Sequence, residues 1–476
     1  MSSCARAVLA ALALATGHAQ AEARLEAVVE EVARHEADAV ALASDLWDFA
    51  ELGYLEEKSA RRLSEYLSGQ GFAVEEGVAG IPTAFVATRG EGEPTLGILA
   101  EFDALPGLSQ AALPERRPVV ADAPGHACGH HLFGAASVVA AVAVARWLEA
   151  EGREGTVRVY GTPAEEGGSG KVYLTRAGLF EDVDAVLHWH PSDRNDASPS
   201  SSTANKSGRF SFEGAAAHAA AAPDKGRSAL DGVEAMNYMV NLMREHVPSD
   251  ARIHYVITDG GDAPNIVPEY AEVYYYVRHP RPERAVALFE RVVAAAEGAA
   301  LGTDTRMSYE VMHGNYPVLR NDALAEVIDA NLRALGGVAY SAEEQAFAEA
   351  IRTTLLSPRL GLGSQGEIQR FEFRQGMGST DVGDVSWNVP TGGFRTATWV
   401  PGTPAHSWQA VAAGGMSIGH KGMVLAAKVL AATAADLFEA PEVLAAAQEE
   451  LERRRGDDFV YEALLGDRDP PLDYRK

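Results

Sequence analysis

The chain alternates short apolar runs with longer amphipathic stretches. Four short runs have the length and composition of buried strands, at 84–88, 96–102, 157–161 and 183–189. Three longer stretches carry apolar side chains at helical spacing, at 22–52, 58–70 and 132–147. This alternation predicts an α/β domain in which helices cover a mainly parallel sheet.

A different rhythm follows from residue 207 to residue 312. It reads strand, helix, strand, strand, helix, strand, at 208–213, 226–245, 252–258, 271–278, 282–297 and 306–312. This β-α-β-β-α-β order is typical of a compact four-stranded module. Because helix-like stretches return from Asp322 and a strand-like run follows at 394–400, we expect a module at 206–316 inserted into a first domain formed by 22–205 and 317–476. The Ser/Asn-rich segment 192–202 is predicted to be a linker.

Length and charge limit the classes of protein and partner. A chain of 476 residues is too long for one ordinary core, which favours two domains. Its formal net charge of −26 would repel a phosphate backbone or an anionic lipid surface at long range. We therefore expect neither nucleic acid nor a membrane as a partner.

The first 21 residues read as a secretory signal. Arg6 and the free amine precede the apolar run Ala7–Ala15, and Ala19-Gln20-Ala21 forms a small-x-small cleavage site before Glu22. This pattern predicts export, to the periplasm or beyond. The alternative is an uncleaved helical extension of a cytoplasmic protein. Once Cys4 leaves with the signal, Cys128 is the only thiol, which excludes an intrachain disulfide.

The segment Gly125–His131, directly before the third helical stretch, places one thiol and three imidazoles within six residues. Thiolate and neutral imidazole are the ligands that zinc-like ions prefer, and Cys128 and His130 belong to one tight turn. The alternative is a buried Cys128 that packs like a small hydrophobic residue, beside histidines that bond backbone groups at a helix start.

Polar side chains also follow the predicted strands. Asp103 comes after 96–102, Glu165 and Glu166 after 157–161, and His190 after 183–189. In open α/β sheets the site lies beyond the carboxyl ends of the strands. Adjacent carboxylates suit a hydrolase that uses metal-activated water, with Glu166 as a ligand and Glu165 free to take the water's proton.

Five of these side chains could together hold two metal ions that share one ligand: Cys128, His130, Glu166, His190 and His406. A lone histidine at the end of an element is more often a local hydrogen-bonding residue. The hypothesis therefore depends on the whole set.

The order of the motifs resembles that of the bacterial p-aminobenzoyl-glutamate hydrolases, within the wider superfamily of metal-dependent aminoacylases, carboxypeptidases and auxin-conjugate amidohydrolases. The matching segments are Glu101–Gly107, Gly125–His130, Pro163–Lys171, Trp189–Pro191, Gly214–Ala220, Ser379–Trp387 and Gly402–Gln409. The resemblance implies a two-metal catalytic domain with an inserted lid and dimerisation domain. It also implies two divalent ions, zinc or manganese, bridged by Cys128. His130 and His190 would complete one site, and Glu166 and His406 the other.

Further roles follow from the same resemblance. Glu165 would be the general base and Asp103 would orient a ligand. His218 would reach the partner subunit's site in a homodimer and stabilise the oxyanion. One residue departs from the motifs of these families, and one ligand position offers a choice between two histidines. His131 stands where the superfamily has Asp and the aminobenzoyl-glutamate group has Asn. His190 is preferred to His188 because it belongs to the Trp-His-Pro match.

The predicted activity is hydrolysis of the amide bond in N-acyl or N-aryl amino-acid conjugates. The substrate's free carboxylate needs arginine or amide donors, for which Asn265 and Arg278 are the best candidates and Arg227 a weaker one. One alternative is a dipeptidase or aminopeptidase on the same metal framework. Another is a non-catalytic metal-dependent binding protein, against which the presence of Glu165 argues, because a binding protein needs no base.

Overall fold

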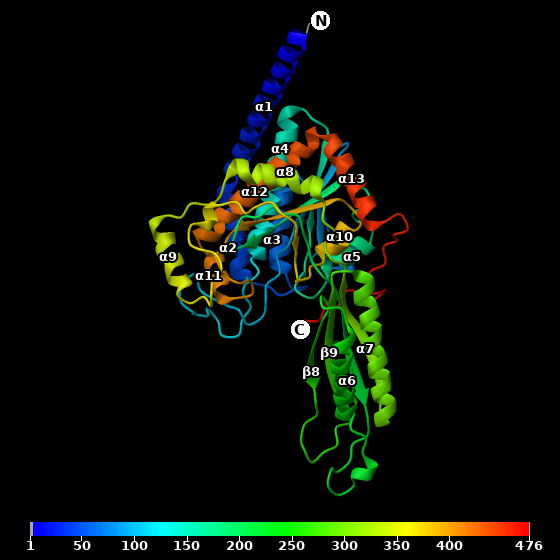
Figure 1. The fold of residues 1–476 in the computed structure, drawn as a ribbon. Coiled ribbons are helices and arrows are strands. Elements are labelled where there is room, and N and C mark those ends of the chain that lie inside the picture. Colours follow the sequence, from blue (N-terminus) through cyan, green and yellow to red (C-terminus); the bar gives the residue numbers. More distant parts are fainter. Residues whose placement is uncertain (1–2, 476) are drawn as a thin grey trace.

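The computed structural model describes residues 3–475, and the side chains of residues 19–475. Most of the predicted signal segment 1–21 therefore lies outside the side chains that the structure describes. Two domains are visible, a larger one that contains both ends of the described chain and a smaller one that projects from it (Figure 1).

The larger domain contains a six-stranded sheet in the order β1-β2-β4-β3-β5-β12. Its strands are Ala73–Glu76 (β1), Phe85–Glu91 (β2), Thr95–Ala100 (β3), Gly155–Gly161 (β4), Ala185–Ser192 (β5) and Thr391–Ala397 (β12). The central strands β4, β3, β5 and β12 run parallel, and β2 pairs antiparallel with β4 and β1. This arrangement confirms the predicted α/β class with a mainly parallel sheet.

Helices cover this sheet. They are Ser3–Arg34 (α1), Glu36–Phe49 (α2), Glu57–Gly69 (α3), His130–Glu151 (α4), Gly170–Arg176 (α5), Asp322–Leu335 (α8), Ala342–Arg352 (α9), Val382–Ser386 (α10), Trp408–Gly414 (α11), Ser417–Glu439 (α12) and Pro441–Arg455 (α13). α4 packs against α12 and lies in the core, and alanine along both helices permits this close approach. Among the described residues, α4 is the helix long and apolar enough to cross a bilayer, but 94% of that window is buried inside the protein.

The inserted domain is a four-stranded antiparallel sheet in the order β10-β7-β9-β8. It comprises Ala204–Glu213 (β7), Ala229–Met243 (α6), Arg252–Asp259 (β8), Tyr270–His279 (β9), Pro282–Thr303 (α7) and Arg306–Asn315 (β10). Its element order is the predicted β-α-β-β-α-β order. The domain has its own core, in which Phe210, Phe212, Val273 and Val292 are fully buried between the sheet and its two helices.

The register of the inserted sheet defines its two ends. Ala204 pairs with His279 at the end beside the larger domain, and Glu213 pairs with Tyr270 at the opposite end. The loops 214–228 and 260–269 therefore form the far tip of the inserted domain, consistent with the projecting loops below α6 and β8 in Figure 1.

Two local expectations differ from the structure. β5 continues to Ser192 because its parallel pairing with β12 extends that far, so His190 lies within the strand. Segment 192–202 is not a free linker. It is mostly buried, and the Asn195 side chain donates hydrogen bonds to the carbonyls of Gln365 and Glu367. The serine and asparagine side chains of this segment form hydrogen bonds within the protein, whereas those of a free linker would bind water.

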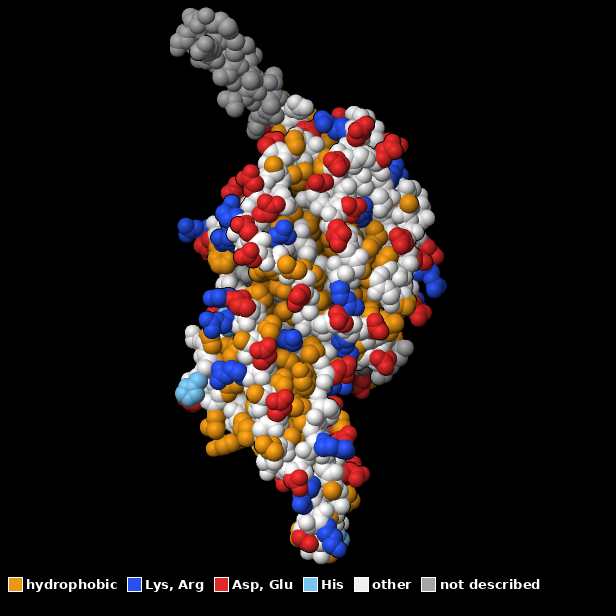
Figure 2. All heavy atoms as spheres, turned by 90° about the vertical axis from the view of Figure 1, so that its right-hand side faces the viewer, with side chains coloured by type: hydrophobic (Ala, Val, Ile, Leu, Met, Phe, Trp, Pro, Cys, Tyr) orange, Lys and Arg blue, Asp and Glu red, His pale blue; other side chains and the backbone are white. Residues whose placement is uncertain are grey.

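Charged side chains of both signs cover the surface shown in Figure 2. On the face shown in Figure 2, acidic and basic side chains are interspersed, with no continuous basic patch.

Candidate active site

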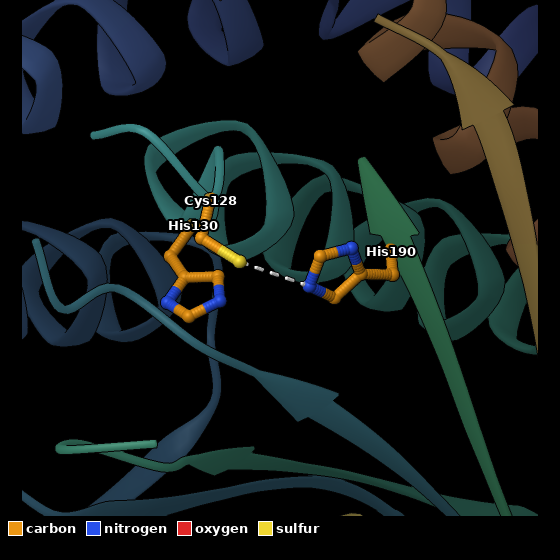
Figure 3. Close-up of side chains that lie close together, drawn as sticks. All are labelled: Cys128, His130 and His190. Atoms are coloured by element: carbon orange, nitrogen blue, oxygen red, sulfur yellow. Dashed lines mark hydrogen bonds between the residues drawn. The ribbon is translucent and has the colours of Figure 1, made fainter. Parts of the chain in front are cut away.

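The turn before α4 brings Cys128 and His130 together with His190 of β5. The three side chains point toward one another in Figure 3, and Cys128 Sγ lies 3.4 Å from His190 Nε2. Gly129 has a φ of 83°, and an added Cβ would lie 2.7 Å from Pro191 Cβ. Only glycine fits this close approach and this backbone conformation.

A second cluster shares Cys128. The ligand atoms of Cys128, Glu166 and His406 lie within 4.8 Å of one another, as do those of Cys128, His130 and His190. His406 Nε2 lies 3.0 Å from Glu166 Oε1. His406 N donates to Ala127 O over 3.0 Å, which holds the loop before α11 against the Cys128 turn. The structure thus brings the five sequence-predicted ligands into two groups with one shared thiol.

A third group contains a residue that was not a sequence-based candidate. Glu101, directly after β3, lies with His130 and Glu165 in a set whose ligand atoms are also within 4.8 Å. Glu101 Oε2 is 3.1 Å from His130 Nε2, and Glu101 Oε1 is 2.7 Å from Lys171 Nζ. Glu101 could have been identified from the sequence, because it lies two residues before Asp103 at the carboxyl end of a predicted strand.

Asp103 holds two of the candidate ligands in place. His130 Nδ1 donates to Asp103 Oδ1 over 2.8 Å, and Glu166 N donates to Asp103 Oδ2 over 2.9 Å. Burial alone would raise the pKa of Asp103, but the facing His130 ring lowers it. An ionised Asp103 fixes the His130 tautomer so that Nε2 faces the cluster.

The cluster fits a pair of divalent cations. Three buried atoms that face it lie close to one another or to His406 but make no hydrogen bond in the described part of the chain: Glu101 Oε2, His130 Nε2 and Glu166 Oε1. Buried polar atoms are normally satisfied, so these orphans indicate a missing ligand. Thiolate, imidazole and carboxylate are the donor set of zinc-like ions, and the shared Cys128 suits a bridge.

Glu165 lies beside the metal-ligand candidates without belonging to the Cys128 groups. Loss of solvent, and then the neighbouring Glu166 carboxylate, raise the pKa of Glu165 well above its ordinary value. A carboxylate with a raised pKa is a stronger base and holds a proton more readily once it has accepted one.

The other histidines of these motifs point elsewhere. His131 Nε2 lies 3.1 Å from Gly414 O, and His126 Nε2 lies 2.9 Å from Leu46 O, so both rings contact helix carbonyls in the core. His188 lies against Gly393, where an added Cβ would be 2.1 Å from its Nε2. His190, and not His188, thus joins Cys128.

A cavity of about 440 Å³ opens beside the cluster. Its walls come from the Glu165 loop, from β7, β9 and β10 of the inserted domain, from residues 378–381 and from the end of the chain. Arg278, one of the residues predicted to bind the substrate's carboxylate, lines it. Asn205, Arg209 and Arg475 also line it and were missed, because a polar residue within a strand or near a terminus shows no sign of pointing into a cavity.

His218 and Asn265 do not line this cavity. They lie together at the tip of the inserted domain, where Ala219 N donates to Asn265 O and His218 forms a bridge with Ile266. Their predicted roles therefore require a second subunit.

Comparison with known proteins gives one consistent result. Residues 97–368 match Peptidase family M20/M25/M40. The chain is 40% identical over 437 residues to a subunit of the p-aminobenzoyl-glutamate hydrolase of Escherichia coli (strain K12), covering 86% of this chain and 91% of that protein. It is 31% identical over 425 residues to Xaa-Arg dipeptidase of Mus musculus, covering 86% and 88%.

Solved structures show the same fold. A dinuclear metal-binding peptidase of the M20 family from Bacillus subtilis matches with a TM-score of 0.57 at 19% identity, over 85% of this chain and 99% of that chain.

Proposed function

Since the chain belongs to peptidase family M20/M25/M40, we propose that it cleaves the amide bond between an acyl or aryl group and an amino acid, the reaction named in its Escherichia coli relative, a p-aminobenzoyl-glutamate hydrolase. The chain is a carbon–nitrogen bond hydrolase of this family. The observation that carries the proposal is a cluster suited to two cations beside a cavity lined by a half-buried arginine, Arg278, that forms no ion pair with the described residues.

Two divalent ions, zinc or manganese, would be held by five side chains: Cys128 as the bridge, with His130, His190, Glu166 and His406. When bound, such ions acidify water and polarise a carbonyl oxygen. Asp103 would keep His130 and Glu166 in their binding orientations through its hydrogen bonds to the His130 ring and the Glu166 amide.

Glu165 would act as the general base. It would accept a proton from the attacking water and return the proton to the departing amine nitrogen. Its raised pKa supports both steps, because the carboxylate must hold the proton between them. A positioned base of this kind contributes about 10²–10⁴-fold to the rate.

Arg278 would bind the α-carboxylate of the amino-acid part. It lies on β9 at the end beside the larger domain, and its buried Nε has no partner in the described part of the chain. A guanidinium in that state gains a charge-assisted bond when a carboxylate enters.

We further propose a homodimer formed through the inserted domain. β8 is an edge strand, with Val256 55% exposed and Ile257 41% exposed. α6 packs on β9 and presents exposed Tyr238 and Leu242. An apolar edge strand is a template for pairing with another chain, here a second copy. In such a dimer, His218 at the tip would reach the partner's site and stabilise the oxyanion, and Asn265 beside it would bind the substrate's carboxylate there.

Export through cleavage after Ala21 is also part of the proposal. Its support is the charged, apolar and small-residue order of the first 21 residues. Mass spectrometry of the protein from its own cell envelope would show Glu22 as the first residue if this is correct, and an intact amino terminus if it is wrong.

Hydrolysis of N-(4-aminobenzoyl)-L-glutamate tests the function. Chelated protein should be inactive, and added zinc or manganese should restore release of the amine. A dipeptidase is the second candidate, because the mouse relative is named a dipeptidase. Dipeptides ending in arginine, tested in the same assay, decide between the two. Hydrolysis of the dipeptides alone would overturn the first proposal.

A further inference from the structure

The last described residues, up to Arg475, lie beside the active-site cavity. After α13, the segment 456–475 returns across the junction between the two domains, where the C label lies in Figure 1. Tyr461 donates to Asp384 Oδ1 over 2.8 Å, and Arg468 Nη1 donates to Met312 O over 2.7 Å. These contacts fix the path of the last residues, Pro471–Arg475, which we call the strap.

The strap forms one wall of the cavity. Pro471, Tyr474 and Arg475 all line it. Tyr474 packs edge-to-face on the buried Tyr54, with ring centroids 5.6 Å apart. Arg475 Nη2 donates to Glu166 O over 2.7 Å, so the strap is attached to the loop that carries Glu165 and Glu166.

Two of the guanidinium groups that line the cavity form no ion pair with the described residues, although the carboxylates of Glu165, Glu166 and Asp381 line the same cavity. Arg278 and Arg475 each have a buried Nε with no hydrogen-bond partner in the described part of the chain. Asp381, which also lines the cavity, is already paired with Lys171 at 2.7 Å. Arg209 lies 3.9 Å from Glu272. The cavity's remaining positive charge therefore belongs to Arg278 and Arg475.

Asn205 adds a neutral donor and acceptor beside one of these cations. It is the register partner of Arg278, its side chain is fully buried, and neither amide atom has a partner in the described part of the chain. Buried donors and acceptors without hydrogen bonds are unfavourable. The side chains of Arg278, Arg475 and Asn205 therefore indicate a ligand with several oxygen atoms.

We propose that the strap makes the enzyme selective for amides of dicarboxylic amino acids, with Arg475 binding the side-chain carboxylate while Arg278 and Asn205 bind the α-carboxylate. This inference rests on the proposed function and names its substrate class. The α-carboxylate, common to every N-acyl amino acid, is assigned to the rigid strand residues. The variable group is assigned to the strap. Both guanidinium groups line the same cavity of about 440 Å³, so a ligand that carries two carboxylates can bind one group with each.

The test compares two substrates of nearly equal shape, N-benzoyl-L-glutamate and N-benzoyl-L-glutamine, on metal-loaded full-length protein. The wild type should prefer the glutamate compound in kcat/KM. Arg475→Gln should lower that preference roughly 10- to 100-fold, the loss expected when one charge-assisted hydrogen bond is removed. Arg453→Gln is the matched control, because Arg453 is an exposed arginine in the last turn of α13 and does not line the cavity. It should leave the preference unchanged.

Equal losses on both substrates in Arg475→Gln would overturn the proposal and reduce Arg475 to a structural contact. An unchanged preference would overturn it too. Calorimetric binding of the two compounds separates this failure from failure of the proposed function. If the wild type hydrolyses neither compound, tighter binding of N-benzoyl-L-glutamate that disappears in Arg475→Gln still supports the strap, and equal binding of both compounds overturns it.

Discussion

Replacing Lys171 by Met removes the cation that lies between two buried carboxylates. Lys171 Nζ is 2.7 Å from Glu101 Oε1 and 2.7 Å from Asp381 Oδ1, and all three side chains are at most 1% exposed. Removing one partner of a buried ion pair costs about 3–5 kcal/mol, because the remaining charge is left without compensation. Methionine is close to lysine in size and leaves only a small void at this position. The lost positive charge therefore accounts for most of the expected loss of stability.

This cost converts into a measurable shift of the melting temperature. An unfolding entropy of about 2.1 cal/mol/K per residue gives roughly 1 kcal/mol/K for 476 residues. Lys171→Met should therefore lower the melting temperature by about 3–5 °C in a calorimetric scan of metal-loaded protein. Lys225→Met is the matched control, because Lys225 is exposed and forms no ion pair with the described residues. A surface substitution of this kind changes stability by about 0.5 kcal/mol or less, so its shift should stay below about 1 °C. Equal shifts in the two variants would refute the assignment of Lys171 as the counter-ion of two ionised carboxylates.

Three further predictions concern metal, assembly and pH. Cys128→Ser should lose most bound metal by elemental analysis, since one thiolate serves both ions, and unchanged metal would contradict the bridge. Mixing inactive Glu165→Gln with inactive His218→Ala should restore about a quarter of wild-type activity after complete subunit exchange, because one of the two sites in each mixed dimer is whole; exchange without recovery would exclude a shared site. Burial raises the pKa of Asp384 to about 8, so the stability that its neutral form contributes is complete below the unfolded value of about 3.9 and is lost as pH rises through 8. Asp384→Asn should flatten the fall in melting temperature between pH 5 and pH 8, and an unchanged fall would show that another group titrates.

The fold was predictable because its elements follow local rules. Strands such as 96–100 are apolar on both faces, as a covered parallel sheet requires, and the longer stretches between the strands have the spacing of helices. The order of elements in the inserted domain followed from the same periodicity. Segment 192–202 was misread because its serine and asparagine side chains bond the backbone of residues 365–370, which are distant in the sequence.

The ligand cluster was predictable for a different reason. Cys128, His130, Glu166 and His190 each lie in a motif at the end of an element, where an α/β sheet gathers its site. Lys171 and Asn205 gave no such signal. A lysine on a short helix and an asparagine on a strand look solvated, and only the packing of the two domains shows that both are fully buried. The strap was missed for the same reason, since nothing local indicates that a chain end returns to a cavity.

The division of labour between Glu165 and Glu166 is tested most directly by measuring metal content and turnover in Glu165→Gln and Glu166→Gln side by side. Glu165→Gln should keep close to two metal ions per chain and lose about 10²–10⁴-fold of its rate on N-(4-aminobenzoyl)-L-glutamate. Glu166→Gln should lose metal, because Glu166 shares a cluster with Cys128 and His406. Equal metal loss in both variants, or near wild-type turnover by Glu165→Gln, would contradict a two-metal amidohydrolase in which Glu165 is the base.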